Sequence, residues 1–69
     1  MDPDATYAVV LDEANVTLTE RAMHALDLLV WITQGGFLPG EQTVGNRNRV
    51  VDTCERVITN ALDPDWLAD

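Results

Sequence analysis

The feature that most constrains this chain is the stretch 18–34, LTERAMHALDLLVWITQ, which is followed by Gly35 and Gly36. Glu20 stands three residues after Thr17, which is the spacing of a capping box at the start of a helix. A glycine pair ends a helix readily, because glycine adopts a left-handed backbone without a Cβ penalty. We therefore predict a helix over residues 18–34.

The apolar side chains of this helix cover more of its surface than one packing neighbour requires. At about 100° per residue, six of them gather on one side: Leu18, Ala22, Ala25, Leu26, Leu29 and Ile32. Met23 and Val30 widen that side on one flank, and Leu28 widens it on the other. The apolar arc then spans more than half of the helix circumference. We expect a central helix covered from two sides, or one that also contacts a second subunit.

The remaining stripe of the helix carries polar residues and one large aromatic side chain. Trp31 lies one turn after Asp27 and two turns after His24. Aromatic side chains often dominate the energetics of protein interfaces. Trp31, with His24 and Asp27 beside it, is therefore a candidate partner-binding surface.

Residues 47–62 predict a second amphipathic helix, capped by Asn46 or Asn48. Its apolar residues share one arc, which consists of Val50, Val51, Cys54, Val57, Ile58, Ala61 and Leu62. Asp52 and Arg56 lie four residues apart, so we expect an exposed ion pair between them.

The N-terminal segment is also expected to be helical. Its Asp-Pro-Asp sequence combines an N-cap acid, a proline at the first helical position and a second acid in the first turn. Apolar residues then recur with helical spacing from Tyr7. The alternative is a strand over 6–11 followed by a turn at 12–15, because this segment is rich in strand-forming residues. We favour a helix over 3–14 that ends at Asn15.

Residues 35–46 contain glycine, proline and asparagine at a density typical of a connection. Phe37 and Leu38 are apolar, and we expect them to anchor this loop beneath the helices. The connection is too long for a compact helix-turn-helix motif.

The C-terminal residues 63–69 repeat the Asp-Pro-Asp of the N-terminus and predict one further helical turn. Trp66 and Leu67 either dock on the core or form an acid-flanked aromatic tag. Both residues are candidate partner-binding residues on the second interpretation.

The fold expected from these patterns is all-α. It is a small three-helix bundle with helices over about 3–14, 18–34 and 47–62 and a short C-terminal helical turn, forming one domain. A core of this size supplies only about 3–5 kcal/mol of net stability. One cysteine and one histidine provide neither an intramolecular disulfide nor a metal site. We therefore expect a homodimer, and neither a metal nor another cofactor.

Twelve acidic and four basic residues give the chain a formal net charge of −8. This charge disfavours nucleic-acid backbones and anionic membranes as partners, and it favours a basic protein. No signal peptide or membrane-spanning stretch is recognised, so we expect a cytoplasmic protein. The absence of serine and lysine suggests a GC-rich genome, such as that of an actinobacterium or a bacteriophage.

No arrangement of residues predicts catalysis. Nucleophilic catalysis needs a nucleophile next to a base, but serine is absent and Cys54 lies on the apolar arc of its helix. Arg47 and Arg49, beside Asn46 and Asn48, could hold a phosphate at a helix N-terminus, although capping and ion pairing are the favoured roles.

We therefore expect a small acidic interaction or regulatory protein without catalytic activity, and a phage-encoded protein that acts on a host protein fits this description. The alternatives are a nucleic-acid-associated regulator that contacts nucleic acid through residues 46–49, and an acidic inhibitor that mimics DNA.

Overall fold

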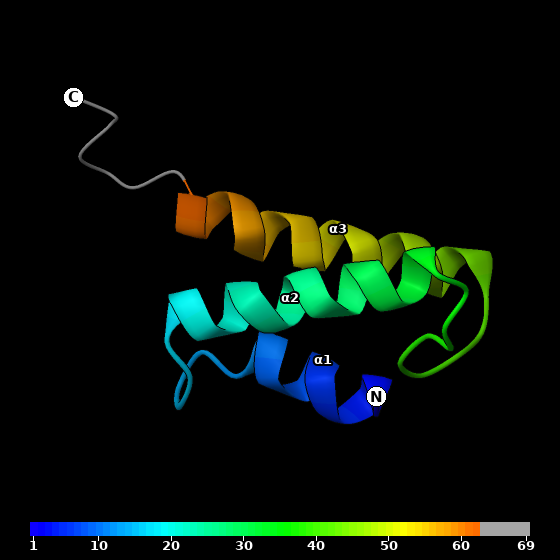
Figure 1. Ribbon diagram of the computed structural model, residues 1–69, viewed down its shortest axis with the longest axis horizontal. Coiled ribbons are helices and arrows are strands. Elements are labelled where there is room, and N and C mark those ends of the chain that lie inside the picture. Colours follow the sequence, from blue (N-terminus) through cyan, green and yellow to red (C-terminus); the bar gives the residue numbers. More distant parts are fainter. Residues whose placement is uncertain (63–69) are drawn as a thin grey trace.

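The computed structural model describes residues 1–62, which form three α-helices: α1 (Pro3–Leu11), α2 (Leu18–Thr33) and α3 (Val44–Leu62). Successive helices run in opposite directions, and α2 packs against both α1 and α3 (Figure 1). The predicted all-helical, three-helix architecture is confirmed for these residues, and the strand considered over 6–11 is wrong. The predicted C-terminal turn lies outside the described residues, as do Trp66 and Leu67.

Helix α1 begins as predicted but ends three residues early. The Asp2 carboxylate accepts backbone N–H groups from Asp4 at 3.1 Å and Ala5 at 3.2 Å, as an N-cap should. The predicted end at Asn15 is wrong, because the Asp12 carboxylate accepts the Asn15 backbone N–H at 3.2 Å and its side-chain amide at 3.1 Å. This local turn competes with the helical hydrogen bonds and stops α1 at Leu11.

Threonine side chains set the starts of the other two helices. Thr17 Oγ1 accepts the Glu20 backbone N–H at 3.2 Å, which confirms the predicted cap of α2. The predicted start of α3 at residue 47 is wrong, because Thr43 Oγ1 accepts the Asn46 backbone N–H at 3.1 Å. Thr43 therefore caps the helix in place of Asn46 or Asn48, and α3 gains a turn at its N-terminus.

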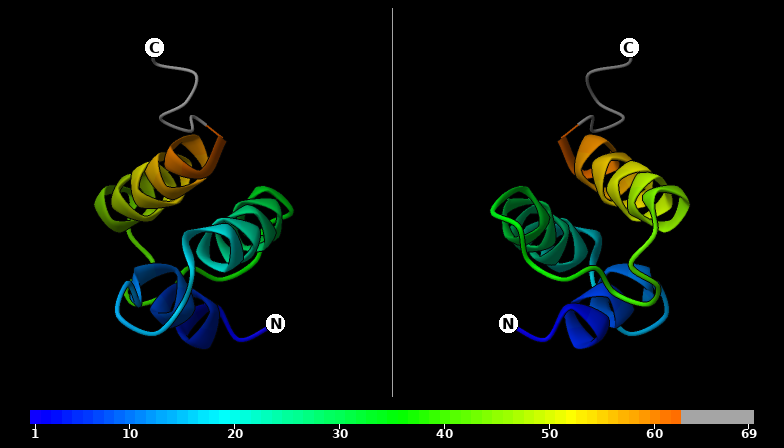
Figure 2. Two further views of the ribbon diagram at one scale, coloured as in Figure 1. Left: turned by 90° about the vertical axis from the view of Figure 1, so that its left-hand side faces the viewer. Right: turned by 90° about the vertical axis from the view of Figure 1, so that its right-hand side faces the viewer.

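All three helices contribute to one small core. The buried apolar residues of this core are Val10 from α1, Ala25, Leu28 and Ile32 from α2, and Val50, Cys54 and Val57 from α3. The apolar side of α2 is rotated relative to the prediction, because Leu28 is completely buried whereas Leu26 is 55% exposed. End-on views show α1 on one side of the α2–α3 pair (Figure 2). The opposite side of that pair is not covered by any helix of residues 1–62.

Side-chain amides hold the connection between α2 and α3. Gln42 Oε1 accepts the Leu38 backbone N–H at 2.7 Å, and Asn46 Nδ2 donates to the Pro39 carbonyl at 2.8 Å. The Asp4 carboxylate accepts the Gly40 N–H at 2.8 Å, which ties the start of α1 to this loop. Leu38 packs against the core as expected.

Phe37 differs from its neighbour in the loop. Its side chain is 74% exposed, so the expectation that it anchors the loop beneath the helices is wrong. Its backbone carbonyl is hydrogen-bonded to the Trp31 side chain at 2.8 Å, which holds this stretch of loop against the end of α2 while the phenyl ring faces solvent.

Replacing Leu28 with alanine tests the position of the core. We expect Leu28→Ala to lower the free energy of unfolding by about 2–5 kcal/mol, because it leaves a cavity among fully buried side chains. Leu11→Ala is the matched control, since Leu11 is 54% exposed. Urea denaturation followed by circular dichroism measures both changes. Equal effects of the two substitutions would contradict the central position of Leu28.

Candidate functional site

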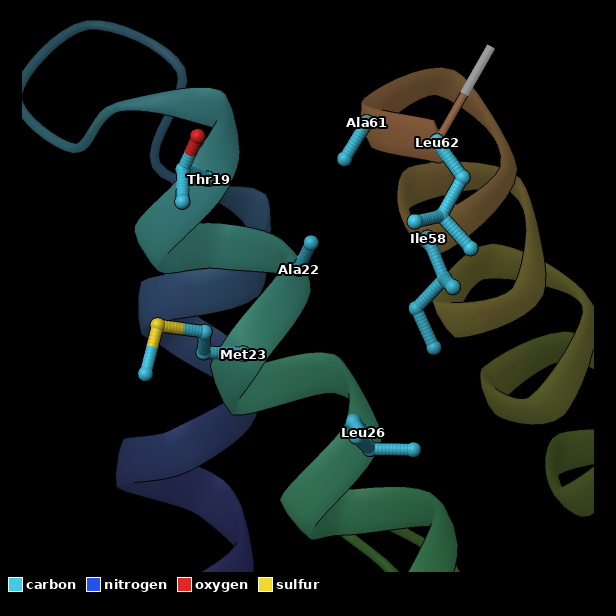
Figure 3. Close-up of a pocket in the computed structure, with 7 residues that line it drawn as sticks. All are labelled: Thr19, Ala22, Met23, Leu26, Ile58, Ala61 and Leu62. Atoms are coloured by element: carbon cyan, nitrogen blue, oxygen red, sulfur yellow. The ribbon is translucent and has the colours of Figure 1, made fainter.

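An apolar groove lies between the first half of α2 and the last turns of α3. Its cavity volume is ≈ 280 Å³, and its lining consists of Thr19, Ala22, Met23, Leu26, Ile58, Ala61 and Leu62. Figure 3 shows Ala22 and Leu26 of α2 facing the α3 residues Ile58 and Ala61 across the groove. None of the described residues that line it carries a charge.

Within residues 1–62, the groove forms where small side chains of α2 and α3 face each other on the side of the pair away from α1 (Figure 2). Ala22 and Ala61 each present only a methyl group, so the two helices leave space between them. Helix α1 covers the opposite side of the α2–α3 pair (Figure 2). The larger side chains at the groove therefore stay in contact with water. Met23 is 63% exposed and Leu62 is 74% exposed.

The sequence contains a signal for this groove, namely the wide apolar arc of the helix predicted over residues 18–34, which indicates a helix covered from two sides or one that also contacts a second subunit. Met23, Leu26 and Val30 made the apolar arc of α2 wider than one neighbour needs, and all three are exposed. On α3, the groove residues Ile58 and Leu62 belong to the apolar arc predicted from the sequence. A surplus of apolar residues on one helix face marks a surface of this kind, although spacing alone does not show which part of the arc is covered.

The size and lining of the groove decide what it can bind. An apolar cavity of about 150 Å³ is known to bind benzene, so a groove of ≈ 280 Å³ is large enough for an aromatic or branched aliphatic side chain. Among the described lining residues, the Thr19 hydroxyl is the only side-chain N–H or O–H group. The groove is therefore suited to an apolar group rather than to a charged ligand.

Trp31, the main candidate from the sequence, takes part in ending α2. The Gly35 N–H donates to the Ile32 carbonyl at 3.0 Å, and the Gly36 N–H donates to the Trp31 carbonyl at 2.8 Å. These two bonds, with Gly35 at φ 91°, form a Schellman motif. The Trp31 side chain adds a third hydrogen bond at this helix end, because its indole N–H donates to the Phe37 carbonyl at 2.8 Å.

The Trp31 ring also lies directly over Gly36. A Cβ atom at Gly36 would be 2.2 Å from ring atom Cε2 of Trp31, which is closer than real contacts allow. The ring is half-buried and packs on the core. Trp31 therefore stabilises the end of α2, whatever it does toward a partner.

His24 and Asp27 lie on the same helix face as Trp31, at helical spacing. His24 is half-buried, and its Nδ1 atom is 2.8 Å from the Glu20 carbonyl oxygen. Asp27 is exposed. Partner binding by these three residues stays a prediction.

Arg47 lies at the end of the first turn of α3 and Arg49 lies in the second turn, because the helix begins at Val44. Both arginines are exposed, and neither forms an ion pair with another residue of the described part of the chain. The side-chain amide of Asn46 donates to the Pro39 and Glu41 carbonyls, so it serves the loop and is not free to join them in binding a phosphate.

Cys54 is a core residue, as predicted. Its side chain is completely buried, and burial raises the pKa of the thiol from 9.0 to about 11. The thiol is therefore protonated at neutral pH and is a poor nucleophile. Within residues 1–62, no group of three or more His, Cys, Asp or Glu side chains could hold a metal ion.

Two further findings concern the whole described chain. None of its three helices is both long and apolar enough to cross a bilayer. Comparison with protein-family models, curated proteins and solved structures finds no match to this sequence. The function proposed below is therefore argued from the groove and its surroundings.

The contact between Trp31 and Gly36 can be tested by adding one methyl group. We expect Gly36→Ala to lower the free energy of unfolding by about 1–3 kcal/mol, because the methyl group displaces the Trp31 ring. Gly45→Ala is the matched control. A Cβ at Gly45 meets no atom within 4 Å, and stability there should stay unchanged or rise by up to about 1 kcal/mol. Thermal unfolding of both variants checks the difference, and an unaffected Gly36→Ala protein would contradict the contact.

Burial of Cys54 predicts a pH dependence. The unfolded thiol loses its proton near pH 9.0 and the folded thiol only near 11, so stability is fully present below 9.0. It should fall as the pH rises through this window. Urea titrations across the window measure the fall, and Cys54→Ala should remove the contribution of the thiol.

At neutral pH, the thiolate fraction and hence labelling by a thiol reagent should be about 100-fold lower in the folded than in the unfolded protein. Equal labelling rates would contradict the burial.

Proposed function

We propose that this protein is a small interaction or regulatory protein without catalytic activity that binds an apolar side chain of a protein partner in the α2–α3 groove. The observation that carries this proposal is a groove whose lining, among residues 1–62, has no charged side chain, in a chain of net charge −8. Large exposed apolar side chains that cluster around a hollow are typical of interaction surfaces in soluble proteins.

Burial of the exposed side chains at the groove would contribute favourable free energy to association. Met23, Leu26 and Leu62 are each more than half exposed. Full burial of a leucine or methionine side chain contributes about 1.5–3 kcal/mol. Covering these three residues and filling the groove would offset a substantial part of the entropy cost of association, which is several kcal/mol or more.

The partner that we propose first is a second copy of the chain, in keeping with the homodimer expected from the sequence. A fold with this few buried residues gains much from additional buried area. Two copies of charge −8 repel each other over most of their surfaces. The described residues that line the groove are uncharged, so contact between two copies there buries no carboxylate of that lining.

A basic protein is the second candidate partner, and the net charge supports it. The two candidates have opposite salt dependences, because salt screens both repulsion between like charges and attraction between opposite charges. Self-association should become tighter as salt is added, whereas binding of a basic partner should weaken. Sedimentation at low and high salt, with and without a lysine-rich amphipathic peptide, separates them.

A charge placed in the groove tests the proposed function. We expect Leu26→Asp to weaken self-association at least about 30-fold, because a carboxylate would have to be buried in an apolar site. Leu11→Asp is the matched control: Leu11 is similarly exposed but lies on α1, away from the groove. Sedimentation equilibrium measures the association of both variants, and circular dichroism checks that they fold. Association that survives Leu26→Asp unchanged would contradict the proposal.

A further inference from the structure

We draw no further inference here: the strongest candidate, the apolar groove between the first half of α2 and the last turns of α3, ends at Leu62, where the described residues stop, and nothing in the structure shows what covers it.

Discussion

The packing of one side of α2 against both neighbouring helices is the interaction on which the rest of the structure depends. Leu28, with Ala25 and Ile32 beside it, fills the space between α1 and α3, and each of these residues is buried. Helix α1 is only nine residues long, and isolated helices of that length are marginal in water. Its order therefore comes from burying Val10 in the shared core and from the hydrogen bond between Asp4 and the loop before α3.

The same packing creates the surface to which we assign a function. Because α1 and α3 cover adjacent sides of α2, the third side keeps Met23 and Leu26 in water. At the other end of the bundle, the side chains of Trp31, Gln42 and Asn46 form hydrogen bonds with the backbone of the loop between α2 and α3. Within residues 1–62, one end of the bundle thus has an apolar groove that no helix covers, and the other end has a hydrogen-bonded loop from which the Phe37 ring projects.

Much of the fold was predictable because helix periodicity and capping are local properties. The caps at Asp2 and Thr17, the stop at the glycine pair and the burial of Cys54 all follow from neighbouring residues in the chain. The boundary errors arose where two polar residues compete for one role. Thr43 caps α3 in place of Asn46, whose amide is drawn to the loop carbonyls instead. Sequence spacing does not rank such competitors, because their energies differ by less than the contribution of one tertiary hydrogen bond.

The sequence by itself determined that this chain forms three helices, that α2 carries more apolar surface than one neighbour can cover, and that the molecule is strongly acidic. Only the tertiary structure decided which part of that surface is buried, placing Leu28 in the core and leaving Leu26 in a groove. It also decided that the Trp31 indole is used within the fold and that Phe37 projects from it. The physical reason is that periodicity specifies which residues share a helix face, whereas burial depends on where the neighbouring helices pack.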